Sequence, residues 1–119
     1  MSDRVIVVGA GPVGLTCAAL LARAGVPVLL LEATPERARD LRASTWHPPT
    51  LDMIESLGLA EPLIARGLVT PTGQVRMHPS GERAVFDLGV LAGETHHPYR
   101  LQCEQQVYCE LLEERLPGF

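Results

Sequence analysis

The stretch Val5–Glu32, which reads VIVVGAGPVGLTCAALLARAGVPVLLLE, decides the fold of this sequence. It begins with four β-branched residues, and its last strand-like run is Val28–Leu31. Short apolar runs of this kind are typical of parallel strands that are buried on both faces. Between the runs, apolar residues recur at helical spacing until Gly25. We therefore predict an α/β fold in which Val5–Val8 and Val28–Leu31 are adjacent parallel strands joined by a right-handed helical crossover.

Three glycines follow the first strand in the pattern G-x-G-x-x-G. Gly9 allows the sharp turn out of the strand, Gly11 leaves the backbone open to a pyrophosphate, and Gly14 lets helix and strand pack closely. The N-terminus of the helix then directs its N–H groups and its positive dipole end toward the phosphates. We predict that this turn, including Pro12 and Val13, binds the pyrophosphate of a dinucleotide.

Glu32 stands at the carboxyl end of the second strand. An acid in this place, roughly twenty residues after the glycines, accepts hydrogen bonds from the hydroxyls of the adenosine ribose. Ala33 follows it and is a further candidate contact. The alternative interpretation is a glycine-rich turn that only packs.

The composition is that of a globular protein, with 119 residues, 46% hydrophobic and 20% charged. The net charge of -4 disfavours nucleic acid or an anionic membrane as the main partner. No apolar run is long enough to span a bilayer, and no cleavable leader follows Met1. Cys17, Cys103 and Cys109 are odd in number and lack metal spacing. We therefore expect a cytoplasmic protein with free thiols.

The rest of the sequence alternates short helical and strand patterns. Thr34 and Pro35 suit the N-cap and first position of a short helix or loop, and the two prolines after His47 exclude a helix interior. The further predicted elements are an amphipathic helix capped by Thr50 and ending at Gly58, a short helix in 59–67 with Leu63 and Ile64 inward, an antiparallel hairpin of 74–78 with 83–88, and a last helix from Gln105 to Leu116.

Three blocks of the sequence resemble the FAD-binding domain of flavin-dependent aromatic hydroxylases, the single-component group related to p-hydroxybenzoate hydroxylase. The first block is Val5–Glu32, in which seventeen residues separate the last glycine from the acid. The second runs from Arg42 to Leu59 and is similar to the family's "RA…HPRTLE…LGL" pattern, although Pro49 stands where arginine is common. The third runs from Leu101 to Leu112 and is similar to the family's "Q…LE..L" helix start.

The resemblance implies a Rossmann-like βαβ unit with a parallel sheet, FAD as the cofactor and NAD(P)H as the co-substrate. It also implies that Arg42 and Ala43 lie by the flavin and that Gln105 contacts it. The activity that it implies is a monooxygenase reaction that hydroxylates a small aromatic, phenolic substrate with O2. The acid at position 32 would repel a 2′-phosphate, which favours FAD over NADP. The alternatives are a solvated arginine at position 42 and an ordinary first-turn glutamine at position 105.

The resemblance covers residues 1–119 as the N-terminal part of an FAD-binding domain. Members of the family continue with a Gly-Asp motif for the flavin ribityl and phosphate and with an Asp-Gly motif, and neither dipeptide occurs here. We therefore expect an incomplete domain without a substrate domain, and a 119-residue chain that is inactive alone. Two alternatives stay open: a non-catalytic truncated nucleotide-binding fragment, and an FAD- or NAD-dependent oxidoreductase that is not an oxygenase.

No catalytic residue is predicted within this sequence, because the cofactor carries the chemistry in such enzymes. His96 and His97 have no acid at metal-ligand spacing, so we expect a loop and no metal site. Asp87 and Glu94 show no paired-carboxylate arrangement in the sequence. The sequence assigns neither the particular aromatic substrate, nor NADH against NADPH, nor the oligomeric state.

Overall fold

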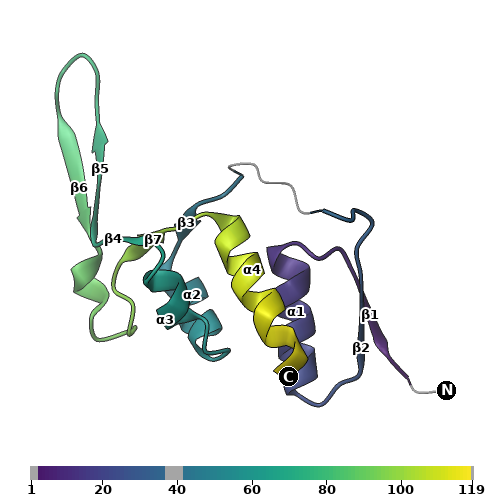
Figure 1. The fold of residues 1–119 in the computed structure, drawn as a ribbon. Coiled ribbons are helices and arrows are strands. Elements are labelled where there is room, and N and C mark those ends of the chain that lie inside the picture. Colours follow the sequence, from purple (N-terminus) through teal and green to yellow (C-terminus); the bar gives the residue numbers. More distant parts are fainter. Residues whose placement is uncertain (1–2, 37–41, 119) are drawn as a thin grey trace. The chain divides into compact units, whose positions relative to one another are not determined.

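The computed structural model describes residues 3–36 and 42–118, which form a mixed α/β structure (Figure 1). The chain divides into two compact units. The first unit contains residues 1–43 and 104–119, and the second contains residues 44–103.

The first unit contains a parallel pair of strands, β1 (Val5–Val8) and β2 (Val28–Leu31). The two strands pair in register from Val5 with Val28 to Val8 with Leu31. Helix α1 (Pro12–Arg23) connects them, and a second helix, α4 (Gln105–Arg115), packs on α1. The predicted adjacent parallel strands, the intervening helix and the last helix are therefore confirmed.

Two glycines set the path from β1 into α1. Gly9 has a φ of +99°, a left-handed conformation that side chains rarely adopt, and its N–H donates to the Leu31 carbonyl at 2.7 Å. A Cβ on Gly14 would overlap the Gly9 carbonyl oxygen and would lie 3.0 Å from the Gly9 carbonyl carbon. The sharp turn and the close packing expected of these glycines are thus confirmed. After α1, Gly25 has a φ of +76° and ends the helix as predicted.

The two strands are not buried on both faces in this chain, although their apolar runs are typical of strands that are. The side chains of Ile6 and Val8 are 61% and 80% exposed, and Leu31 is 45% exposed. In β2 the exposure alternates, since Val28 and Leu30 are half-buried and their neighbours are exposed. The physical reason is that a sheet with helix α1 packed on it is covered on the helix side, while its other face meets solvent.

The core of the first unit lies between α1 and α4, which run side by side in Figure 1. The buried apolar residues of the helix pair are Leu15, Ala18, Ala19, Tyr108, Cys109, Leu111 and Leu112. The Tyr108 hydroxyl lies 2.5 Å from Thr16 Oγ1, and Thr16 Oγ1 donates to the Pro12 carbonyl at 2.6 Å. Because the Thr16 hydroxyl donates its only proton to the Pro12 carbonyl, the Tyr108 hydroxyl must be the donor in the bond between Tyr108 and Thr16. Burial raises the pKa of Tyr108, which keeps this donor protonated.

Replacing Tyr108 by phenylalanine should lower the free energy of unfolding by about 1 kcal/mol, the usual net value of one internal hydrogen bond. The aromatic ring stays, so the loss reports the bond to Thr16 rather than the packing. Urea denaturation followed by circular dichroism measures the change. In a Thr16→Ala background, the same substitution should lower the free energy of unfolding by clearly less. An equal loss in both backgrounds would show that the two hydroxyls are not coupled.

The second unit contains two antiparallel sheets and two short helices. A three-stranded sheet has the order β3 (Thr45–Trp46), β7 (Arg100–Gln102), β4 (Leu68–Thr70). A hairpin of β5 (Thr72–Arg76) and β6 (Arg83–Asp87) pairs Thr72 with Asp87 and Arg76 with Arg83. The remaining elements are helices α2 (Pro48–Glu55) and α3 (Ala60–Ile64) and the 3-10 turn η1 (Leu88–Leu91), while a second 3-10 turn, η2 (Leu116–Gly118), follows α4 in the first unit.

The predicted hairpin and both predicted short helices are present, but their boundaries differ from the prediction. The first hairpin strand is Thr72–Arg76 rather than 74–78, and the second short helix is Ala60–Ile64 rather than 59–67. Helix α2 begins at Pro48 and has His47, not Thr50, as its N-cap residue. The two prolines occupy the first turn, where their fixed φ suits a helix and their missing N–H groups cost nothing. The core under these helices consists of Leu51, Ile54, Leu57, Leu59, Leu63 and Leu101. Ile64, which was expected to point inward, is only half-buried.

The helix or loop predicted after Pro35 falls mostly on residues 37–41, outside the described residues. Cys17 is exposed, whereas Cys103 and Cys109 are buried, and none of the three forms a disulfide within the part of the chain that the structure describes. Within residues 3–36 and 42–118, none of the helices has the length and apolar character needed to cross a bilayer.

Candidate functional site

The first half of the candidate site is the turn from β1 into α1. Gly11 is the N-cap residue of α1, and no described side chain caps this helix end. Pro12 occupies the first helical position, and Val13 beside it is 80% exposed. A Cβ placed on Gly11 would meet no atom of residues 3–36 or 42–118 within 4 Å, so these residues leave the space beside Gly11 open. An uncapped helix N-terminus behind an open glycine is suited to an anionic group such as a pyrophosphate.

Three hydrogen bonds hold the Glu32 carboxylate, and one of them comes from this turn. Its Oε2 accepts from the Ala10 N–H at 2.7 Å, and its Oε1 accepts from the Thr34 N–H and the Thr34 hydroxyl, both at 2.9 Å. The acid at the end of β2 and the glycine-rich turn at the end of β1 are therefore brought together as the sequence predicted. The structure adds Ala10 and Thr34, which sequence reasoning did not assign to the site.

The hydrogen bonds lower the pKa of Glu32 from 4.5 to about 2. The largest cause is the Thr34 N–H, followed by the Ala10 N–H and then the Thr34 hydroxyl. Because the pKa is lowered in the folded chain, the stabilisation from these bonds is fully present above about pH 4.5. It is lost as the pH falls toward 2.

This arrangement predicts the titration of a single carboxyl group. In an NMR pH titration of the 119-residue chain, the Glu32 side-chain carbon should shift with a midpoint near 2. Thr34→Ala removes the hydroxyl and should raise that midpoint, since one of the donors that favour the charged form is gone. A midpoint close to 4.5 in the folded wild-type chain would contradict the contact between Glu32 and the glycine-rich turn.

Glu32 keeps capacity for a ligand, as the chemistry of a ribose contact requires. A carboxylate has about four acceptor positions; the Ala10 and Thr34 donors take three, and the Ala33 N–H adds a smaller contribution to the lowered pKa. Glu32 and Ala33 are both exposed, so a ribose hydroxyl can reach the carboxylate. The residues present therefore fit the adenosine end of a dinucleotide.

The second half of the candidate site lies at the N-terminus of α4. The Gln105 N–H donates to the Ala43 carbonyl at 2.9 Å, which brings two residues of the predicted flavin end together. Arg42 precedes Ala43 and is exposed. Figure 1 shows that α1 and α4 begin at the same end of the helix pair, and a contact between Thr16 and Tyr108 joins their N-terminal halves. Gln105 thus lies at the end of the unit where the glycine-rich turn is found.

Comparison with known proteins identifies the family. The sequence profile of the "FAD binding domain" family matches residues 3–117. The 6-hydroxy-3-succinoylpyridine 3-monooxygenase of Pseudomonas putida is 38% identical over 116 residues, which are 98% of this chain and 30% of that protein. With its match over nearly the whole described length, the chain belongs to the FAD binding domain family.

Solved structures of flavin-dependent hydroxylases resemble this chain in fold. The crystal structure of p-nitrophenol 4-monooxygenase from Pseudomonas putida DLL-E4 superimposes with a TM-score of 0.87 at 36% identity, covering 98% of this chain and 29% of that one. A ternary complex of aklavinone-11 hydroxylase with FAD and aklavinone superimposes with a TM-score of 0.77 at 26% identity, covering 99% of this chain and 25% of that one. The chain therefore spans between a quarter and a third of the length of these relatives.

Proposed function

We propose that this chain is the N-terminal FAD-binding segment of a flavin-dependent monooxygenase that hydroxylates a small aromatic substrate. The observation that carries the proposal is the family match over residues 3–117, together with relatives named as aromatic monooxygenases. The contact between Glu32 and the Ala10 N–H supports it from the geometry, because it places a charged acceptor beside an open helix N-terminus.

The residues divide between the two ends of FAD. Gly9, Gly11 and Gly14 shape the turn for the pyrophosphate, and Glu32 accepts from the adenosine ribose. Pro12, Val13 and Ala33 line this end. At the other end Arg42, Ala43 and Gln105 bind near the flavin. In this proposal β1, α1 and β2 are the first βαβ unit of a Rossmann-like sheet, with the right-handed crossover that such units adopt.

FAD, when bound, supplies the redox chemistry with NAD(P)H and O2, and the protein contributes binding and placement. The residues of this chain hold the adenosine end by hydrogen bonds and helix dipole, and none of them is assigned a proton-transfer role. The 119 residues alone are therefore expected to bind nucleotide without turning over substrate. The enzyme is proposed to act on a phenolic or related ring in the cytoplasm.

A chimera tests the proposal directly. Residues 3–117 would replace the matching segment of p-nitrophenol 4-monooxygenase, which shares 36% identity with this chain. We expect a protein that binds FAD and takes up oxygen when p-nitrophenol and NAD(P)H are present. The same chimera with Gly11→Ala is the control and should fold but bind FAD poorly. A folded, monodisperse chimera that binds no FAD would contradict the proposal.

The same assay separates the proposal from the two alternatives. A simple dehydrogenase would oxidise NAD(P)H without consuming oxygen in proportion to hydroxylated product. A non-catalytic fragment would give a chimera with no FAD-dependent rate at all. Oxygen uptake that matches the amount of hydroxylated product would exclude both alternatives.

A further inference from the structure

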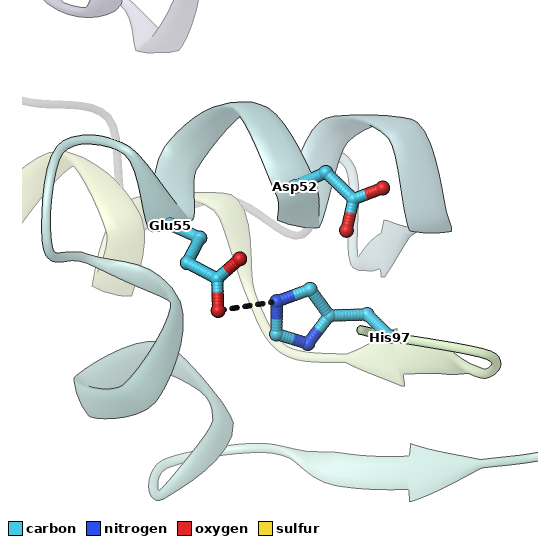
Figure 2. Close-up of side chains that lie close together, drawn as sticks. All are labelled: Asp52, Glu55 and His97. Carbon is cyan, nitrogen blue, oxygen red and sulfur yellow. Dashed lines mark ion pairs between the residues drawn. The ribbon is translucent and has the colours of Figure 1, made fainter. Parts of the chain in front are cut away.

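A cluster of three ligand-type side chains lies in the second unit, and none of its members is assigned to FAD (Figure 2). Asp52 and Glu55 are three positions apart on α2, so their carboxylates leave the same face of the helix. His97 comes from the loop before β7, and its ring faces the two acids in Figure 2. One oxygen of each acid and one nitrogen of His97 all lie within 4.8 Å of one another.

His97 is the unusual member of this cluster. The residue is 6% exposed, and its Nδ1 lies 2.9 Å from the Tyr99 hydroxyl. Its Nε2 is buried and makes no hydrogen bond to any part of the chain that the structure describes. The nearest carboxylate oxygen, Glu55 Oε1, is 3.5 Å away. A buried ring nitrogen left without a hydrogen bond is costly, so it requires an explanation.

The neighbours of the cluster hold two of its members in place. The Thr95 hydroxyl donates to Asp52 Oδ1 at 2.7 Å and accepts from the His97 N–H at 2.9 Å. The Tyr99 hydroxyl fixes the His97 ring through Nδ1. This is the outer-shell arrangement that orients metal-binding histidines and carboxylates in proteins. Glu55, with a side chain 47% exposed, is the member that is free to adjust.

We propose that Asp52, Glu55 and His97 bind a divalent transition-metal ion such as Zn²⁺ or Mn²⁺. One imidazole and two carboxylates form a donor set that suits these ions, and the two negative charges match the charge of the ion. The predicted absence of a metal site near His96 and His97 overlooked acids that only the fold brings near. This site goes beyond the proposed FAD-binding role and shares no residue with it.

The spacing requires only a small adjustment. Two ligands of one ion, with bonds of about 2.1 Å, lie between about 3 and 4.2 Å apart. The widest separation in the cluster is at most 4.8 Å, so the ligands must approach by roughly an ångström. Rotation of the Glu55 side chain can supply this movement. An open depression of about 320 Å³, lined by both acids and residues 92–96, leaves room for water as a further ligand.

The competing explanation is a proton instead of a metal ion. A protonated His97 would form an ion pair with Glu55, and His96 Nδ1 also lies 3.2 Å from Glu55 Oε2. Such pairs would tie the loop to α2 without binding an ion. The two explanations differ in the role of Asp52. The bound metal ion requires the Asp52 carboxylate as a ligand, whereas an ion pair between His97 and Glu55 does not involve Asp52.

The test is a titration of the chelator-treated 119-residue chain with ZnCl₂ by isothermal calorimetry, and with CoCl₂ by visible absorption. We expect one ion per chain. His97→Gln should abolish binding, and Asp52→Asn and Glu55→Gln should each weaken it by about tenfold or more. The matched controls are His78→Gln, an exposed histidine of the hairpin loop, and Glu61→Gln, an exposed acid of α3. Both controls should bind as the wild type does.

A second measurement keeps the test decisive if a variant fails to fold. In the wild-type chain, MnCl₂ below one equivalent should broaden the NMR signals of the His97 ring and leave those of His78 unchanged. Equal broadening of both histidines, no binding at millimolar ZnCl₂, or full binding by folded Asp52→Asn would each overturn the proposal. Loss of binding in His97→Gln with an unchanged circular dichroism spectrum would support it.

Discussion

Replacing Gly14 by alanine is expected to unfold the first unit or to destabilise it by about 3 kcal/mol or more, the upper range for forcing extra atoms into a packed site. The new Cβ would overlap the Gly9 carbonyl oxygen. That backbone cannot retreat easily, because Gly9 is in a left-handed turn and its N–H is bonded to Leu31. Urea denaturation followed by circular dichroism measures the loss.

Gly11→Ala is the matched control for this prediction. A Cβ on Gly11 meets nothing within 4 Å, and the residue has a φ of -74°, which alanine adopts without strain. The Gly11→Ala chain should therefore unfold at a urea concentration close to that of the wild type. If Gly14→Ala also unfolds there, α1 does not pack on the β1 turn as closely as the structure has it.

Replacing Glu32 by glutamine should weaken FAD binding by about tenfold to hundredfold, the range expected when one charge-assisted hydrogen bond is lost. The substitution keeps the size of the side chain and removes the charge that accepts from Ala10 and Thr34. Quenching of flavin fluorescence measures the affinity. Glu36→Gln alters an exposed acid four residues further on and should bind FAD as the wild type does. Equal affinities for the Glu32 and Glu36 variants would remove Glu32 from the site.

The sequence predicts the first unit well because its signals are local. The strand Val5–Val8, the three glycines and the acid at position 32 are linked by spacing, and each has a specific conformational reason. Gly9 and Gly14 are found in the roles that their positions indicate. The exposure of Ile6 and Val8 could not be predicted in this way. An apolar run indicates that a strand suits a buried environment, but it does not indicate which element covers the strand.

The three-stranded sheet of the second unit was not predictable in the same way. Its strands are two or three residues long, and β3, β4 and β7 come from distant parts of the chain. Segments this short show no alternation that distinguishes a strand from a loop. Trp46 illustrates the point, because its indole N–H donates to the Cys103 carbonyl at 2.8 Å, a contact that only the folded chain provides.

The Glu32 site and the cluster of Asp52, Glu55 and His97 also differ in how far the sequence predicts them. Glu32 could be assigned from its place after a strand, whereas its contacts with Ala10 and Thr34 form only in the folded chain. The grouping of His97 with Asp52 and Glu55 depends on a loop folding back on α2. No spacing rule connects a histidine with acids so far away in the sequence.

The central claim is that this chain binds FAD by its adenosine end, at the turn beside Glu32. The most direct test is a fluorescence titration of the 119-residue chain with FAD, repeated with ADP or FMN as competitor and with Glu32→Gln. We predict that ADP displaces FAD, that FMN does not, and that the variant binds more weakly. Displacement by FMN but not by ADP, with unchanged affinity in Glu32→Gln, would contradict the claim.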